Sequence, residues 1–160
     1  MIHKIKIFLL LILTSTCSFG QVVINEYSAS NTGNLIIDNK GNKTDWFELY
    51  NNSGSAVNIA GWNISDDKLN FTKDAFPAGT SISANGFLRV WCSGLGANAS
   101  ASGHLHTNFK LTQCEGDWII ISNGGVVVDS IQMRRTQNIH SRGRLPNGTS
   151  TWKIDRKSVV

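Results

Sequence analysis

Beyond its first twenty residues the sequence has no long apolar run, which excludes a membrane-spanning helix there. It also lacks helical hydrophobic periodicity of useful length, heptads, low-complexity segments and internal repeats. These absences disfavour helix-rich folds, coiled coils and repeat arrays. Only two prolines and three cysteines occur among 160 residues, whereas fifteen glycines and many asparagines favour strands joined by turns.

The first twenty residues have the pattern of an export signal. A basic start precedes a short apolar run over residues 7–13, and Ser18 and Gly20 place small side chains before a cut at Gln21. The apolar run is shorter than the ~20 residues that a bilayer core requires. Two alternatives stay open, namely a retained anchor and a lipid anchor on Cys17.

We therefore predict a signal peptide over residues 1–20, one domain over residues 21–155 and a short tail over residues 156–160. Loss of the leader, with Lys4 and Lys6, would lower the formal net charge from +4 to +2, which is near neutral. The apolar content of 41% is enough for one core. The expected location is secreted or extracytoplasmic, with association to the cell surface as one form of it.

Short strand-like runs follow one another along this domain without helices between them. The clearest signal is a hairpin around Asn123-Gly124-Gly125, because Asn and Gly accept the positive φ that such a turn needs and β-branched residues flank it. The continuous apolar runs on both sides of this turn predict strands that are buried on both faces or lie near the centre of a sheet. This pattern predicts an all-β fold, an antiparallel β-sandwich. The expected strands are 22–27, 45–50, 57–59, 62–64, 71–76, 87–91, 109–111, 118–122 and 126–131.

Ten short pieces, in a fixed order, carry a further signal. They are Ile-Asn-Glu at 24–26, Asp-Trp-Phe-Glu-Leu-Tyr-Asn at 45–51, Val-Asn-Ile-Ala-Gly-Trp at 57–62, Ser-Asp-Asp at 65–67, Phe-Pro-Ala-Gly-Thr at 76–80, Asn-Gly-Phe-Leu-Arg-Val-Trp at 85–91, His-Thr-Asn-Phe-Lys-Leu at 106–111, Asp-Ser at 129–130, Gly-Arg-Leu-Pro-Asn-Gly at 143–148 and Trp152. Their order and spacing resemble the lamin-tail domain, an immunoglobulin-like β-sandwich found in nuclear lamins and in many secreted bacterial proteins. The export signal favours the bacterial secreted branch.

The resemblance implies a non-enzymatic binding or scaffold module that binds a protein or another ligand at the cell surface. The residues themselves also favour a non-enzymatic module, because the serines lack a nucleophile-elbow pattern and no Ser-His-Asp set is evident. The alternatives are a calcium- or carbohydrate-dependent adhesion module and a weak binder of nucleic acid or anionic glycan. A small hydrolase would require a pocket with convergent polar groups.

Glu26, Asp45 and Glu48 form the best acidic set for a hard cation such as Ca²⁺. The competing interpretation is that these carboxylates bond turn backbone or face solvent, so no cofactor is expected and calcium is kept as the alternative. His104 and His106 point the same way in an extended chain, but no third ligand for a transition metal is evident.

The end of the chain carries the one charge asymmetry. Arg134, Arg135, Arg142 and Arg144 are joined by further cations at positions 153, 156 and 157, and the only acid in this stretch is at position 155. Such a patch can attract nucleic acid or anionic glycan. The alternative is a solvated rim whose cations pair with acids from elsewhere.

Cys92 and Cys114 are the two cysteines that survive cleavage, and an even count outside the cytoplasm favours a disulfide between them. Two buried free thiols are the alternative, since spacing alone does not bring the Cα atoms within reach.

The five tryptophans fall inside apolar strands, so we expect most of them in the core between the sheets. An exposed platform for stacking on sugars is the alternative. The five are Trp46, Trp62, Trp91, Trp118 and Trp152.

Overall fold

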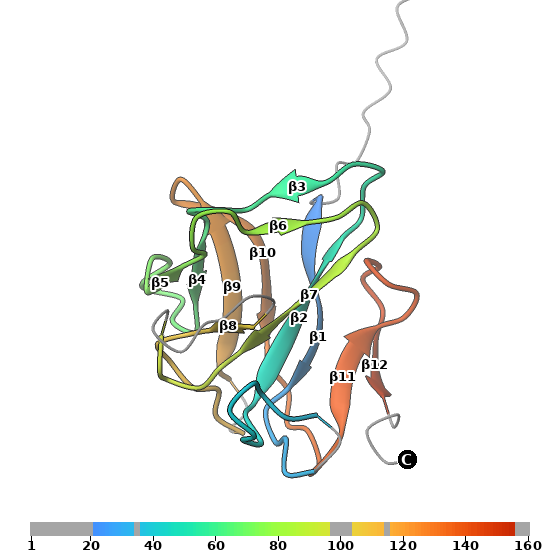
Figure 1. Ribbon diagram of the computed structural model, residues 1–160. Helices are drawn as coiled ribbons and strands as arrows, with labels where there is room; N and C mark the ends of the chain where they lie inside the picture. The colour runs from blue at the N-terminus through green and yellow to red at the C-terminus, as the bar shows by residue number, and fades with distance from the viewer. Residues whose placement is uncertain (1–20, 34–35, 97–103, 114–115, 156–160) are drawn as a thin grey trace, which may run out of the picture.

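The computed structural model describes residues 21–33, 36–96, 104–113 and 116–155. Within these residues the secondary structure is strand and turn without helix, as Figure 1 shows. Accordingly, the described part of the chain contains no helix that is long and apolar enough to cross a membrane. The expected signal peptide, the tail 156–160, Cys17 and Cys114 lie outside the described residues.

Two main sheets face each other, and a small two-stranded sheet lies across the upper end of the sandwich in Figure 1. The six-stranded sheet has the order β12 (Trp152–Asp155), β11 (Ser141–Arg144), β1 (Val22–Ser28), β2 (Trp46–Asn51), β7 (Phe87–Trp91) and β8 (Leu105–His106). The four-stranded sheet has the order β10 (Val126–Gln132), β9 (Trp118–Asn123), β4 (Asn63–Ser65) and β5 (Asp74–Ala75). The third sheet pairs β3 (Val57–Asn58) with β6 (Ser81–Ile82).

Every described strand pairing is antiparallel except that of β7 with β8. The prediction of an all-β, immunoglobulin-like sandwich is therefore confirmed.

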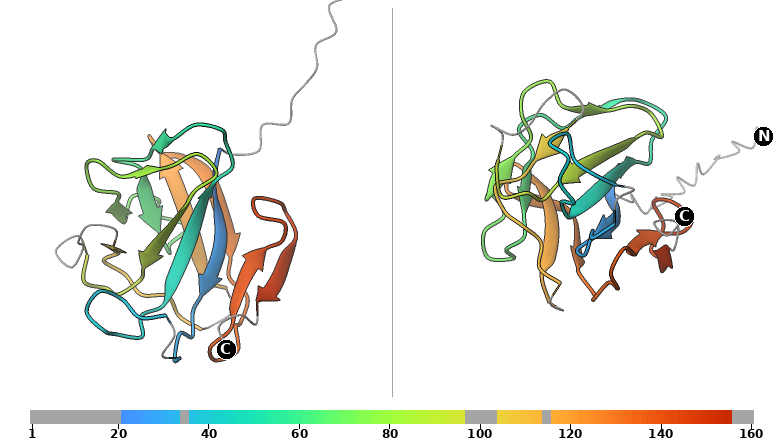
Figure 2. Two further views of the ribbon diagram at one scale, coloured as in Figure 1. Left: turned by 45° about the vertical axis from the view of Figure 1, so that its right-hand side comes forward. Right: turned by 60° about the horizontal axis from the view of Figure 1, so that its bottom comes forward.

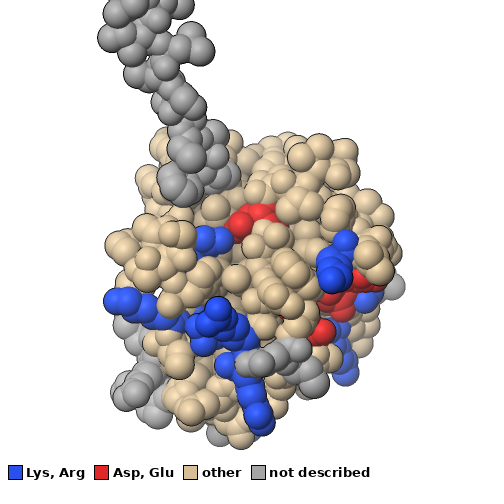
Figure 3. All heavy atoms as spheres, turned by 180° about the vertical axis from the view of Figure 1, so that it is seen from behind, with Lys and Arg blue, Asp and Glu red and all other residues tan. Residues whose placement is uncertain are grey.

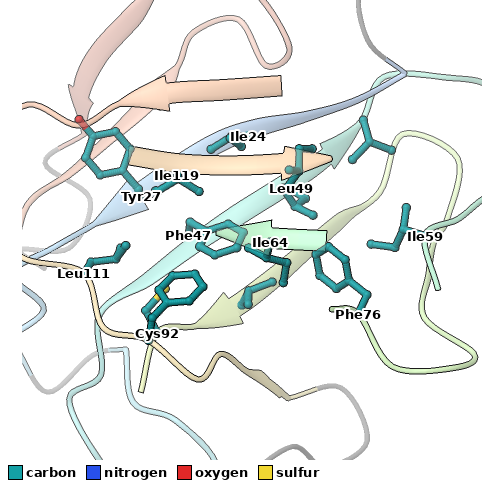
Figure 4. Close-up of a cluster of buried hydrophobic side chains, with 14 of the residues drawn as sticks. Ile24, Tyr27, Phe47, Leu49, Ile59, Ile64, Phe76, Cys92, Leu111 and Ile119 are labelled. Atoms are coloured by element: carbon teal, nitrogen blue, oxygen red, sulfur yellow. The ribbon is translucent and has the colours of Figure 1, made fainter. Parts of the chain in front are cut away.

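The core lies between the two main sheets, where alternate side chains of each strand point inward. Phe47 and Leu49 of β2 belong to one core cluster with Ile119 and Ile121 of β9, and all four are fully buried. Figure 4 shows Phe47, Leu49 and Ile119 in this cluster. Each such side chain contributes about 1.5–3 kcal/mol through the burial of its apolar surface. The period of two residues thus decides which face of β2 enters the core.

The predicted hairpin is present as β9 and β10, with Gly124 and Gly125 at φ values of 57° and 80°. Burial on both faces is correct for β9, whose residues 119–122 are all buried. It is wrong for β10, where Val126 is 70% exposed, because β10 is the outermost strand of its sheet.

Two predicted strands differ from the structure. Residues 109–111 form only an isolated bridge between Lys110 and Ser93, because the Phe109 carbonyl accepts the Thr107 hydroxyl in a local turn. The short strand lies earlier, in β8. The run 71–76 forms a strand only at β5, because residues 70–73 turn back on Asn70, whose side-chain oxygen accepts the Thr72 amide.

The hairpin of β11 and β12 extends the large sheet beyond β1, as the left view of Figure 2 shows. Arg144 fixes this hairpin to both layers. Its guanidinium donates to the carbonyls of Ile24 and Thr149 and pairs with Asp129 of β10 at 2.9 Å. The same group lies 5.0 Å from the ring centre of Trp152. Asp129 also accepts the Ile24 amide, so one ion pair joins three strands.

Replacing Arg144 by Met should therefore lower the free energy of unfolding by about 2–4 kcal/mol, because Asp129 and two carbonyls lose their partner in a partly buried place. Lys73→Met is the matched control, since Lys73 pairs with Asp66 near solvent and its loss should cost less than about 1 kcal/mol. Urea unfolding followed by tryptophan fluorescence measures both. Equal losses in the two variants would contradict the role of Arg144.

Candidate functional site

A groove of about 640 Å³ opens between the segment that follows β10 and strand β11. It carries two guanidinium side chains and several neutral polar groups, and none of the described residues that line it is acidic. We call it the basic groove. It is lined by Gln113, Arg135, Thr136, Gln137, Asn138, His140, Ser141, Arg142 and Ile154.

The end of β1 holds the segment that leads into the basic groove. The Tyr27 hydroxyl accepts the Arg134 amide and donates to the Arg134 carbonyl. Ser28 donates to the carbonyl of His140, and Ser30 accepts the amide of Ile139, which has a φ of 63°. That left-handed φ is unusual for a β-branched residue, so the surrounding contacts define the path of this segment closely.

Tyr27 also shows that two of the predicted arginines lie close together. Burial raises the pKa of the Tyr27 hydroxyl, and the nearby charges of Arg142 and Arg134 oppose this effect. Arg142 lies opposite Tyr27 in the register of β11 and β1. Arg134 and Arg135 are exposed and Arg142 is half-buried, so the structure brings these three predicted cations to one surface.

The view from behind shows the resulting charge distribution. Lys and Arg side chains gather in the lower left of that face, and the Asp and Glu atoms visible there lie outside the group (Figure 3). A positive surface of this kind raises the local concentration of anionic partners.

Arg144 is not part of this surface, which corrects the prediction that it contacts a polyanion. Its guanidinium already bonds Asp129 and two carbonyls, and its side chain is only 12% exposed. Arg142 and Arg144 share a face of β11, but Arg144 lies where Asp129 of the opposite sheet can reach it.

Two polar atoms of groove residues have no hydrogen-bond partner within the part of the chain that the structure describes. They are Oγ1 of Thr136, whose side chain is buried at 6% exposure, and Nδ1 of His140. Buried polar groups are bonded in the great majority of cases. The two atoms therefore mark the basic groove as a place where a further molecule can supply acceptors.

The three candidate calcium ligands do not converge. Glu26 and Glu48 face each other across β1 and β2, but Asp45 accepts the Asn31 amide instead. Among the described residues, no three His, Cys, Asp or Glu side chains gather closely enough to hold a metal ion.

Burial chiefly raises the pKa of Glu48, the charge of Glu26 adds to this, and Arg89 at 3.6 Å opposes it. The Glu26 carboxylate accepts the Ser141 hydroxyl. Both acids line a second groove of about 460 Å³ on the outer face of the large sheet, beside the stacked rings of Tyr50 and Phe87. Arg144 and Lys153 line this groove as well, so its described lining carries charges of both signs.

The structure bears out the prediction of tryptophans in the core in part, because Trp62 and Trp152 pack against the core cluster. Trp46 and Trp91 are buried, but they lie on the outer face of the large sheet, opposite to the face that carries Phe47 and Val90. The guanidinium of Arg89 lies 4.6 Å from the ring centre of Trp46 and 5.9 Å from that of Trp91. The other three tryptophans, at positions 62, 118 and 152, are half-buried.

His106 is buried with both ring nitrogens in use. Nε2 donates to the Asn39 side-chain oxygen at 2.7 Å, and Nδ1 accepts the Ser93 hydroxyl at 3.0 Å. His104 lies half-buried two residues earlier, and its Nδ1 has no partner. His106 therefore connects Asn39, in the loop before β2, with Ser93, just after β7. The two histidines do not present two free nitrogens to a metal.

Cys92 is buried within the core cluster, and its burial raises the pKa of the thiol. The structure has this cysteine as a free thiol. Its expected partner Cys114 lies outside the described residues, so the disulfide stays a prediction.

Comparison with known families gives one match. The family model described as Lamin Tail Domain matches residues 15–135, which is most of the chain. No curated protein matches the sequence. The matched stretch ends at Arg135, so Thr136, His140, Arg142 and the whole β11–β12 hairpin lie beyond it.

His106 gives a prediction for pH. Burial lowers its pKa below the usual value of about 6.5, so the unfolded chain takes up the proton first as the pH falls. The free energy of unfolding should therefore decrease from pH 7 toward pH 5 by more in the natural chain than in His106→Gln. Urea unfolding at both pH values measures the difference. Identical pH dependence in the two proteins would contradict it.

Proposed function

The chain belongs to the lamin tail domain family, and from this premise we propose that it is a secreted, non-catalytic binding module that holds an anionic polysaccharide in its basic groove. The family supports the general part, because its members share an immunoglobulin-like structural fold that is generally non-enzymatic. Location, ligand and the bacterial secreted branch are our proposal.

One observation carries the choice of ligand. The basic groove combines the guanidinium groups of Arg135 and Arg142 with neutral donors and no acidic residue among its described lining. Arginine suits this task, because its planar group keeps its charge and donates several hydrogen bonds in fixed directions. Arg134 adds a third positive charge nearby, because its backbone bonds the Tyr27 hydroxyl and both Arg134 and Arg142 act electrostatically on that group.

Two observations favour a polysaccharide over a nucleic acid. The basic groove offers no exposed aromatic ring among its described lining, and proteins that hold single strands stack bases on such rings. The nearby ring of Tyr27 is only 1% exposed. In addition, the leader-like first twenty residues direct the protein away from cytoplasmic nucleic acid.

The protein should bind dextran sulfate or carboxymethyl dextran and should not bind neutral dextran. Because the attraction is electrostatic, affinity should fall at least about tenfold between roughly 50 and 500 mM salt. Arg135→Gln and Arg142→Gln should each weaken binding about tenfold, while Lys68→Gln, an exposed cation in the turn between β4 and β5, should change it less than about twofold. Biolayer interferometry with immobilised polymer measures all of these.

Binding that survives high salt, or that Lys68→Gln weakens as much as Arg142→Gln does, would overturn the proposal. Tight binding of double-stranded DNA with none to either charged dextran would replace the polysaccharide by nucleic acid.

The proposed location has its own test. Protein recovered from the producing cell should begin at Gln21, as intact mass spectrometry and N-terminal sequencing would show, because Ser18 and Gly20 fit the signal peptidase pocket. A chain that begins at a lipidated Cys17 would place it on a membrane surface instead. A chain that keeps its first twenty residues in the cytoplasm would refute secretion.

A further inference from the structure

We propose that the basic groove is built for a tetrahedral oxyanion, a sulfate or phosphate group on the polysaccharide, rather than for a carboxylate. This inference rests on the proposed function and deepens it. It assigns the recognition to Arg135, Arg142, Thr136 and His140.

The donors of the groove come from different directions. Arg142 projects from β11, whereas Arg135, Thr136 and His140 belong to the segment that Tyr27, Ser28 and Ser30 hold against the end of β1. A carboxylate lies in one plane, and a single guanidinium in a bidentate pair already engages both of its oxygens. Two guanidinium groups, a hydroxyl and an imidazole supply more donors than its two oxygens can use. A sulfate or phosphate group has three strong acceptor oxygens that point in different directions.

Thr136 and His140 provide an independent observation. Thr136 Oγ1 and His140 Nδ1 are buried without a hydrogen-bond partner, although both residues line the groove. A hydroxyl left in this state is costly unless something completes its bonding. If side-chain rotation brings the two polar atoms to the groove that their residues line, an oxyanion between the two arginines would accept from both.

The size of the groove indicates that the oxyanion is part of a larger molecule. About 640 Å³ falls in the range of sites for whole small molecules, roughly 300–1,000 Å³, and is far more than one sulfate or phosphate group fills. The exposed amide side chains of Gln137 and Asn138 line the same groove and offer further hydrogen bonds. The oxyanion therefore enters as a substituent of a longer chain, with sugar hydroxyls along the amides.

The experiment compares dextran sulfate with carboxymethyl dextran of equal charge density, so that backbone and charge are held constant. The natural full chain, Thr136→Val, His140→Leu and the control Thr72→Val are measured by biolayer interferometry at one salt concentration. Thr72 is exposed and its hydroxyl bonds Asn70, far along the chain from the groove. Sodium sulfate, sodium phosphate and sodium acetate at equal ionic strength serve as competitors.

We expect the natural chain to prefer dextran sulfate, and Thr136→Val and His140→Leu each to weaken that binding about tenfold while changing carboxymethyl dextran less than about twofold. Thr72→Val should leave both unchanged. Sulfate or phosphate should displace the polymer at lower concentration than acetate, and the stronger of the two identifies the substituent.

Thr136→Val should also keep or raise the melting temperature, because it removes an unpartnered hydroxyl. A clear drop in melting temperature would show that the hydroxyl serves the fold, and this would overturn the inference. Equal affinity for the two dextrans, with no effect of Thr136→Val, would also overturn it while leaving the proposed function intact. Absence of binding to both dextrans would overturn the proposed function as well.

Discussion

The ion pair between Arg144 and Asp129 is the contact on which the arrangement of the C-terminal part depends. The hairpin of β11 and β12 pairs only with β1 at the edge of the large sheet, so without a link to the second sheet it would rest on one strand. Arg144 provides that link, because its guanidinium reaches Asp129 of β10 as well as the carbonyl of Ile24. The aromatic rings of Tyr27 and Trp152, 5.6 Å apart, fill the space beside it.

The connection between Arg144 and Asp129 separates the two arginines of β11 by their surroundings. Arg142 and Arg144 are two residues apart on β11 and therefore share one face of the strand, yet they have different roles. Arg144 pairs with an acid of the other sheet, whereas Arg142 lies opposite Tyr27 in the strand register and lines the basic groove. A buried arginine with a full set of partners stabilises the fold, and a half-buried one without an acid attracts ligand.

The position of the basic groove relative to the family match has a consequence for specificity. The shared sandwich supplies β1, whose end holds the groove segment through Tyr27, Ser28 and Ser30. Most of the groove itself comes from residues beyond Arg135, where the match ends. The basic groove thus lies mostly on a segment and a hairpin outside the matched stretch, while the matched sandwich supplies the strand end that holds them.

The sequence by itself determined the fold class and the clearest local elements. Alternating and continuous apolar runs predicted strands such as β2 and β9, and the Asn-Gly-Gly turn predicted the hairpin that β9 forms with β10, because residue period and turn chemistry are local properties. The charge asymmetry near the end of the chain also pointed to the surface that forms the basic groove.

Only the tertiary structure decided which strands pair and which side chains contact one another. Ser-Arg-Gly-Arg at 141–144 has no apolar pattern, so nothing local marks it as β11, which forms because β1 offers a free edge. In the same way, the Asp45 carboxylate accepts the Asn31 amide, whereas Glu48 pairs with Arg89. The guanidinium of Arg89 also lies near the rings of Trp46 and Trp91, which are buried outside the main core cluster. The ion pair of Arg144 depends on a carboxylate of the other sheet, and the distance between sheets is not encoded in the spacing of neighbouring residues.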